Sequence, residues 1–174
     1  MKQIIETERL SVRKFRPEDA ARLYEIHTEE SVKKWIPNES YTDIEECREA
    51  IGFYMDHVNA GSLPYVLAVI LKEDGSLIGD TGVNAVEGRI DEVEIGYIIS
   101  EAYSGKGYGA ELLAAMTEYV FTSFRPGVLY GRVIKGNAAS IRVLEKSGYT
   151  FLKEEFGAED DPYGRGMLVY IKKA

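Results

Sequence analysis

Cysteine is nearly absent from this chain, because Cys47 is the only one among its 174 residues. No disulfide can therefore form within the chain. Cys47 lies at helical spacing from Ile44 and Ile51, which favours a half-buried residue of a helix. The alternative, a catalytic thiol, needs a neighbouring base. The two histidines, His27 and His57, show no pairing signal with Cys47.

Long apolar runs and an excess of positive charge are also missing. No run approaches the roughly 20 apolar residues that a membrane-spanning helix needs, and the first nine residues carry charges where a signal peptide is apolar. We therefore expect a cytoplasmic protein with no membrane partner. A net charge of −8 argues against nucleic-acid binding, which depends on Lys and Arg contacts to phosphate. The same charge either attracts a cationic substrate such as an amine or only sets solubility.

The residues that are present are enough for one core. A chain of this length with 45% hydrophobic residues suits a single domain, and no repeat or linker divides residues 1–174. Alternating or continuous apolar runs predict strands at 10–15, 65–72, 77–85, 92–99, 128–134, 149–156 and 167–172. Helical spacing predicts helices that begin at Pro17 and that cover 43–59, 110–122 and 138–146.

The connections between these elements predict the topology of the sheet. Short turns join the early strands, which should therefore be antiparallel. The predicted helix 110–122 connects strands 92–99 and 128–134, and such a crossover makes two strands parallel. We expect an α/β (α+β) fold in which helices flank a mixed, mostly antiparallel sheet.

Three alternating glycines, Gly105, Gly107 and Gly109, separate the strand 92–99 from the following helix. Glycine accepts positive φ and lets a ligand approach the backbone. The N-terminus of a helix also has unpaired N–H groups and attracts negative charge. The loop is therefore predicted to bind a phosphate or pyrophosphate.

Three kinds of phosphate loop are candidates for this segment. Residues 105–110 match the dinucleotide pattern G-x-G-x-x-A, but that pattern expects an acidic residue about 20 positions on, and residues 128–133 contain none. The nucleotide-triphosphate pattern G-x-x-x-x-G-K-[ST] does not occur. The remaining alternative is a loop for the pyrophosphate of an acyl-coenzyme A.

Four segments, in order, carry a more specific signal. They are ETERLSVR at 6–13, EIGYII at 94–99, YSGKGYG at 103–109 and NAASIRVLEKSGY at 137–149. Together they resemble the GNAT superfamily of N-acetyltransferases, and most of all its branch typified by ribosomal-protein N-terminal acetyltransferases, the RimJ/RimL type. The resemblance spans nearly the whole chain and implies a single N-acetyltransferase domain over residues 1–174. It also implies a parallel pair of strands that splay apart at the cofactor site.

The resemblance implies transfer of an acetyl group from acetyl-CoA directly to a primary amine, with no metal. The acceptor would be a protein N-terminus, a polyamine or another small amine. The alternative is a non-catalytic acyl-CoA binding or sensing module on the same fold. A homodimer is left open. The implied cofactor-binding residues are Ile98, Ile99, Ser104, Gly105, Lys106, Gly107, Tyr108, Gly109, Ala110, Asn137 and Ser140.

The acceptor amine is mostly protonated at neutral pH, so a base must take up its proton. Glu94 is the first candidate and Glu92 the second, because period two puts both on one face of the strand. Glu159 is a third. Each is otherwise a solvated or ion-paired glutamate. Ser140 would donate a proton to the departing thiolate, or else satisfy donors of the first helical turn. Asn137 would contact the pantetheine arm, cap the helix, or do both.

Two positions depart from the pattern of the superfamily, and two aromatic residues stay ambiguous. Ser104 stands where many members have Gln or Arg, so that only backbone donors remain there. Leu144 stands where many members have a tyrosine acid. Trp35 and Tyr41 lie between the first two predicted helices and either pack in the core or border the acceptor site.

Overall fold

The computed structural model describes residues 2–157 and 166–174, and this part of the chain forms one eight-stranded sheet in the order β1-β2-β3-β4-β5-β6-β8-β7. Its strands are β1 (Ile5–Glu6), β2 (Leu10–Arg13), β3 (Tyr65–Leu71), β4 (Leu77–Val86), β5 (Arg89–Ile99), β6 (Val128–Ile134), β7 (Thr150–Glu155) and β8 (Met167–Lys173). Its α-helices are α1 (Ala20–His27), α2 (Glu30–Trp35), α3 (Ile44–Ala60), α4 (Tyr108–Ser123) and α5 (Ala138–Lys146). Short 3₁₀ helices lie at Pro17–Asp19, Pro37–Glu39 and Glu101–Tyr103.

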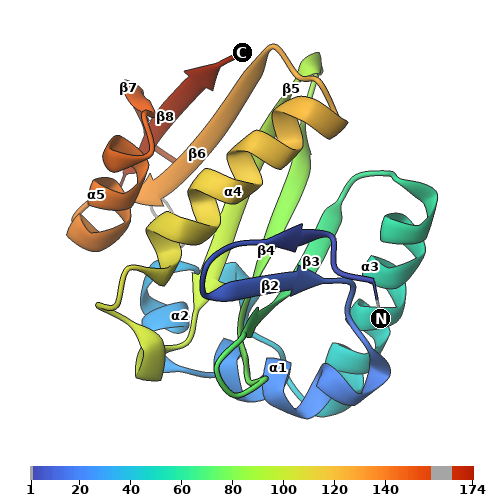
Figure 1. Ribbon diagram of the computed structural model, residues 1–174. Coiled ribbons are helices and arrows are strands. Elements are labelled where there is room, and N and C mark those ends of the chain that lie inside the picture. The colour runs from blue at the N-terminus through green and yellow to red at the C-terminus, as the bar shows by residue number, and fades with distance from the viewer. Residues whose placement is uncertain (1, 158–165) are drawn as a thin grey trace.

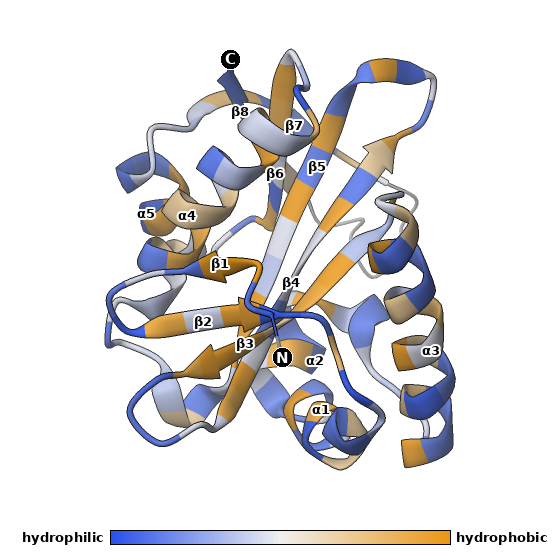
Figure 2. Cartoon of the chain, turned by 45° about the vertical axis from the view of Figure 1, so that its right-hand side comes forward, coloured by the Kyte–Doolittle hydropathy of each residue, from blue (hydrophilic) through white to orange (hydrophobic). Residues whose placement is uncertain are grey.

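Helices cover both faces of the sheet. Helix α4 crosses one face in front of β4 and β5 (Figure 1), and its buried residues Leu112, Met116 and Val120 join the larger core cluster. Helices α1, α2 and α3 bury their apolar residues on the opposite face in a second cluster. Leu67 and Ala68 are neighbours in β3 and belong to different clusters, as expected for side chains that alternate along a strand. Strand β3 is almost entirely hydrophobic, whereas β5 shows alternating hydrophilic and hydrophobic bands along its first half (Figure 2).

Two helix ends show why the chain folds this way locally. Asp43 caps α3 by accepting the Glu46 N–H at 2.8 Å, and Gly61 ends the helix in the left-handed conformation with φ 65°. Asn137 caps α5, because its side chain accepts the Ser140 N–H at 3.3 Å. The predicted capping role of Asn137 is therefore confirmed.

The single parallel contact in the described sheet lies between β5 and β6. The two strands pair only where Glu92–Glu94 meets Val128–Tyr130, although β5 continues to Ile99 and β6 to Ile134. Beyond Glu94 the strands separate, while β5 remains paired with β4 as far as Ile99. The predicted mixed, mostly antiparallel sheet with a splayed parallel pair is confirmed.

Several details differ from the sequence-based expectations. β1 and α2 were not predicted, and α4 begins at Tyr108, two residues before the expected start. Cys47 is fully buried, not half-buried, and burial raises the pKa of its thiol to about 11, which suits a structural residue. Within the described residues, no helix is both long and apolar enough to cross a membrane.

Candidate active site

Two cavities open where β5 and β6 separate. The loop cavity, of about 510 Å³, lies against the glycine loop and the start of α5. The sheet cavity, of about 720 Å³, lies over β4, β5 and β6. Both are lined by Trp35, Ile36, Tyr97, Ile98, Asn137 and Ser140. These shared residues mark the place where the two cavities meet, so a molecule in one can reach a molecule in the other.

The predicted cofactor residues gather around the loop cavity. All of them line it except Lys106. The Lys106 carbonyl instead accepts a hydrogen bond from Arg9 Nη1 at 2.8 Å, and its ammonium lies 5.8 Å from the centre of the Tyr103 ring. Lys106 is therefore the one predicted cofactor residue that does not line the loop cavity, and its described contacts are with Arg9 and Tyr103.

The glycine loop presents a row of free backbone donors. Gly105 and Gly107 have φ of 73° and 84°, which only glycine adopts without strain. In the described part of the chain, the N–H groups from Gly105 to Ala110 have no acceptor, and the first bonded donor of α4 is Glu111 N–H to the Gly107 carbonyl at 3.1 Å. Unpaired donors at a helix N-terminus form an anion site. The loop thus has the chemistry to hold a pyrophosphate.

Gly109 has a different reason to be glycine. It lies inside α4, and a Cβ there would come within 3.1 Å of the Tyr97 ring. Its small size therefore leaves room for Tyr97, whose ring reaches from β5 toward the start of the helix. Burial raises the pKa of Tyr97, and the neighbouring Ser140 side chain partly offsets this rise. The hydroxyl of Tyr97, which lines both cavities, therefore remains protonated at neutral pH.

A clasp between the N-terminal segment and α4 supports the loop, and sequence reasoning missed it. Glu111 accepts hydrogen bonds from the Thr7 hydroxyl at 2.6 Å, from the Arg9 N–H at 2.8 Å and from Arg9 Nε at 2.7 Å. Arg9 in turn donates to the Lys106 carbonyl, and its guanidinium lies 4.4 Å from the centre of the Tyr108 ring. The ETERL segment was recognised as part of the resemblance, but nothing local showed that it holds the loop.

Ser140 and Leu144 project from α5 toward the cavities. Ser140 lines both, and its hydroxyl accepts from the Asn137 amide at 3.3 Å. Leu144 is buried against β6, because a Cβ on Gly131 would lie only 2.6 Å from its Cδ2. Arg142 and Lys146, which were not predicted, add positive charge to the wall of the loop cavity.

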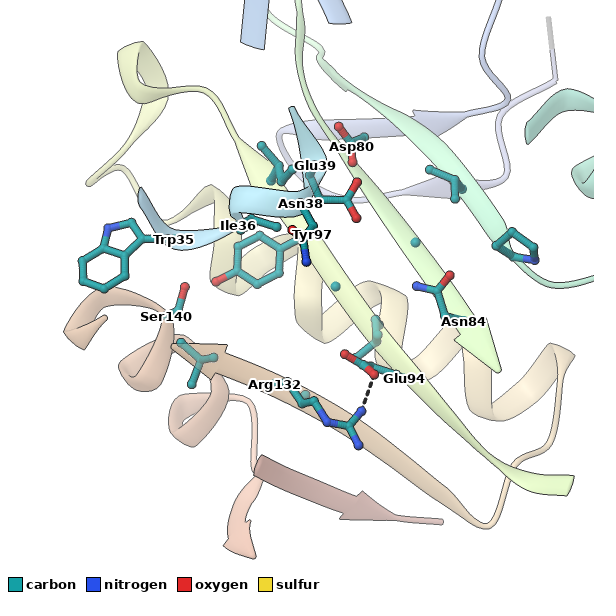
Figure 3. Close-up of a pocket in the computed structure, with 18 of the residues that line it drawn as sticks. Trp35, Ile36, Asn38, Glu39, Asp80, Asn84, Glu94, Tyr97, Arg132 and Ser140 are labelled. Atoms are coloured by element: carbon teal, nitrogen blue, oxygen red, sulfur yellow. Dashed lines mark hydrogen bonds and ion pairs between the residues drawn. The ribbon is translucent and has the colours of Figure 1, made fainter. Parts of the chain in front are cut away.

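The predicted bases lie in different surroundings. Glu94 lines the sheet cavity and forms an ion pair with Arg132 (Figure 3). Burial raises the pKa of Glu94, although the Arg132 charge opposes the rise. Glu92 is not among the described residues that line either cavity, and it accepts a hydrogen bond from the Tyr130 hydroxyl at 2.7 Å. Glu159 lies outside the described residues.

A buried histidine supports the far wall of the sheet cavity. His27 Nε2 lies 2.6 Å from Asp80 Oδ2, and His27 Nδ1 contacts the Glu39 backbone carbonyl. Burial opposes a charge on His27, but the Asp80 carboxylate outweighs it and raises the pKa of His27 to about 9. Both partners are hydrogen-bond acceptors, which suits an imidazolium that donates from each nitrogen. His27 thereby fixes the 3₁₀ helix Pro37–Glu39 over β4.

Aromatic side chains complete the sheet cavity. Trp35 and Tyr41, whose roles were left open, both line it. Tyr41 lies with its ring centre 5.0 Å from that of His27, and its hydroxyl is 3.3 Å from the Tyr54 hydroxyl. Among the described residues, no group of three or more His, Cys, Asp and Glu is arranged to hold a metal ion.

Comparisons with known proteins agree with this geometry. The family model described as "Acetyltransferase (GNAT) domain" matches residues 9–150. The uncharacterized N-acetyltransferase p20 of Bacillus licheniformis is 30% identical over 165 residues, covering 95% of this chain and 90% of that protein. A crystal structure of a GNAT-family acetyltransferase from Bacillus anthracis superposes with a TM-score of 0.80 at 27% identity, over 97% of each chain.

A third similarity concerns the fold alone. RimL, an α-N-protein acetyltransferase in complex with coenzyme A, superposes with a TM-score of 0.82 at 18% identity, over 99% of this chain and 98% of that one. The resemblance seen in the sequence is thus supported by the family match and by the shared fold. The chain belongs to the GNAT family of acetyltransferases.

Proposed function

We propose that this protein transfers the acetyl group of acetyl-CoA directly to a primary amine. The observation that carries the proposal is the meeting of the two cavities at Tyr97 and Ser140. A donor in the loop cavity and an acceptor in the sheet cavity would have their reactive groups side by side at this place. Such proximity and orientation account for much of the rate of a bimolecular reaction inside an enzyme.

The loop cavity fits acetyl-CoA by the chemistry of its wall. The unpaired N–H groups from Gly105 to Ala110 would hold the pyrophosphate, and Arg142 and Lys146 would add charge nearby. The unpaired edge of β5 near Ile98 and Ile99 offers backbone groups to an extended pantetheine arm. Bound acetyl-CoA supplies an activated acetyl thioester.

Side chains of this protein would accept and donate the protons that the reaction transfers. Transfer to a protonated amine forms a C–N bond and breaks the C–S bond; two protons leave the nitrogen, one proton is taken up at sulfur, and one is released to solvent. Glu94 Oε would accept the proton of the amine, directly or through water, because its carboxylate lines the sheet cavity. The Ser140 hydroxyl would donate at sulfur. Glu92 is less well situated, since it lines neither cavity in the described structure.

The test is an assay for free thiol with acetyl-CoA and a panel of primary amines. Thiol release that depends on the amine, together with an acetylated product, is the expected result. Tight binding of coenzyme A with no amine-dependent release across a broad panel would overturn the proposal and favour a non-catalytic acyl-CoA binding module.

Replacing Glu94 by Gln refines this test. The variant should lose about 100-fold in turnover near neutral pH, and less at high pH, where the amine is already neutral. Glu92→Gln is the matched comparison on the same strand face. An equal loss at every pH would assign Glu94 a structural role, and a larger loss for Glu92→Gln would move the base to Glu92.

A further inference from the structure

The sheet cavity contains one carboxylate without a counter-charge. Two cations line its described wall, and each already has a carboxylate partner: His27 with Asp80 at 2.6 Å, and Arg132 with Glu94. No cation of the described residues lies within ion-pair distance of Glu39, which also lines the cavity. The described wall therefore has one uncompensated negative charge.

Glu39 lies among groups that suit a cation. Glu39 remains open to solvent; burial and then the Asp80 charge raise the pKa of its carboxyl, and the His27 charge opposes this rise without forming an ion pair with Glu39. Glu39, Asp80, Tyr41 and Tyr54 all line the sheet cavity, so these four side chains border the same space. A cavity wall that combines carboxylates with aromatic rings is a favourable place for an ammonium group.

The position of Glu39 separates it from the place of transfer. In Figure 3, Ser140 and the Tyr97 hydroxyl lie on one side of the Tyr97 ring, and the carboxylates of Glu39 and Asp80 lie on the other. All of these residues line the same cavity of about 720 Å³, a volume typical of small-molecule sites. A linear molecule could thus reach both ends at once.

We propose that the acceptor is a linear diamine or polyamine, whose second cationic nitrogen is bound by Glu39 while its terminal amine lies beside Ser140. This inference rests on the function proposed above and narrows it to one class of amine. A monoamine gains nothing from Glu39. The N-terminus of a protein offers a second cation only if a basic side chain happens to follow it.

The first experiment compares spermidine with an alkyl monoamine of similar length as acceptors. The wild-type protein should prefer spermidine in kcat/KM by about tenfold or more, the factor expected for one charge-assisted hydrogen bond. Glu39→Gln should remove most of this preference through KM, whereas Glu39→Asp should retain part of it. Glu49→Gln is the matched control, since Glu49 is an exposed glutamate of α3 that lines neither cavity.

A second measurement separates this inference from the proposed function. Calorimetric titration of spermidine into the wild-type protein, without acetyl-CoA, should show binding that weakens with salt and that Glu39→Gln weakens about tenfold. Acetylation of the monoamine and of spermidine with equal kcat/KM would leave the proposed function intact and overturn the inference. Spermidine binding that Glu39→Gln does not weaken would also overturn it, whether or not any amine is acetylated. A preference for a peptide N-terminus would assign the cavity to a protein acceptor instead.

Discussion

Replacing Glu111 by Gln should loosen the clasp that supports the glycine loop. The carboxylate accepts three hydrogen bonds, from the Thr7 hydroxyl, the Arg9 N–H and Arg9 Nε, at 2.6, 2.8 and 2.7 Å. An amide keeps one oxygen as an acceptor but sets an NH₂ group against a donor of this segment. The perturbation is therefore a partial loss of a charged acceptor with little change of volume.

The size of the effect follows from the surroundings of the clasp. Hydrogen bonds to a charged group contribute about 1.5–3 kcal/mol each when well buried, but the Glu111 side chain is 18% exposed and that of Arg9 is 41% exposed. Solvent screening reduces the ionic part, so we expect a loss of about 2 kcal/mol in the free energy of unfolding. For a domain of this size that corresponds to a fall in Tm of about 4–8 °C.

Two measurements test this expectation. Urea denaturation gives the loss of stability, and titration with coenzyme A should show a dissociation constant raised by about threefold to tenfold, because Glu111 then positions Arg9 less firmly against the Lys106 carbonyl. Glu118→Gln, at an exposed position of the same helix, is the control. If the two variants agree within about 0.5 kcal/mol and bind coenzyme A equally well, the clasp does not support the loop.

The pH dependence of the same variant gives an independent check. Burial favours a protonated Glu111, but the bonds from Thr7 and Arg9 outweigh it and lower the pKa of the carboxyl. A carboxyl with a lowered pKa stabilises the folded state above its ordinary pKa, and this contribution disappears as the pH falls through the lowered value. The difference in stability between the wild type and Glu111→Gln should therefore shrink on acidification. A difference that stays constant would contradict the assignment.

Two further predictions concern the other supports of the site. The pKa of His27 is raised to about 9, so protonated His27 stabilises the folded state fully below the ordinary histidine pKa, and this stabilisation is lost as the pH rises toward 9. The free energy of unfolding of the wild type should therefore fall by on the order of 2 kcal/mol over this range. Asp80→Asn should make the free energy of unfolding depend less on pH. Gly107→Val should raise the dissociation constant of coenzyme A at least about tenfold, because φ is 84° and Arg9 Nη2 lies 3.3 Å from the new Cβ. Gly75→Val, at φ 76° in the β3–β4 turn, is its control for backbone strain and should leave that affinity unchanged.

The sequence predicted correctly those helices and strands whose ends are marked by nearby residues. β6 and α5 have the expected bounds, because Asn137 caps α5 and Gly148 follows its end. Helix α2 was missed because its support is distant in sequence. Glu29, just before it, accepts from the Ser100 hydroxyl at 2.6 Å and the Glu101 N–H at 2.8 Å, and Glu101 accepts from the Ser31 N–H. The pattern of residues within the six-residue helix α2 cannot show these contacts, because their partners lie far along the chain.

The same difference between nearby and distant residues applies to the two cavities of the candidate site. The glycine loop and the residues at the end of β5 could be predicted, because one continuous segment makes up most of the wall of the loop cavity. The wall of the sheet cavity could not be predicted as a unit, since Glu39, Asp80 and Arg132 come from three separate parts of the chain and come together only in the folded protein. The pairing of Arg132 with Glu94 likewise joins two strands that the sequence showed only as parallel neighbours.

The contact between His27 and Glu39 has a consequence for how this wall can change during evolution. His27 bonds to the backbone carbonyl of Glu39, not to its side chain. The anchor of the 3₁₀ helix is therefore independent of the residue type at position 39, which can mutate without releasing the helix. Under the proposed role of Glu39, a substitution at this one position would change which amines the cavity binds, while the contact that holds the 3₁₀ helix is kept.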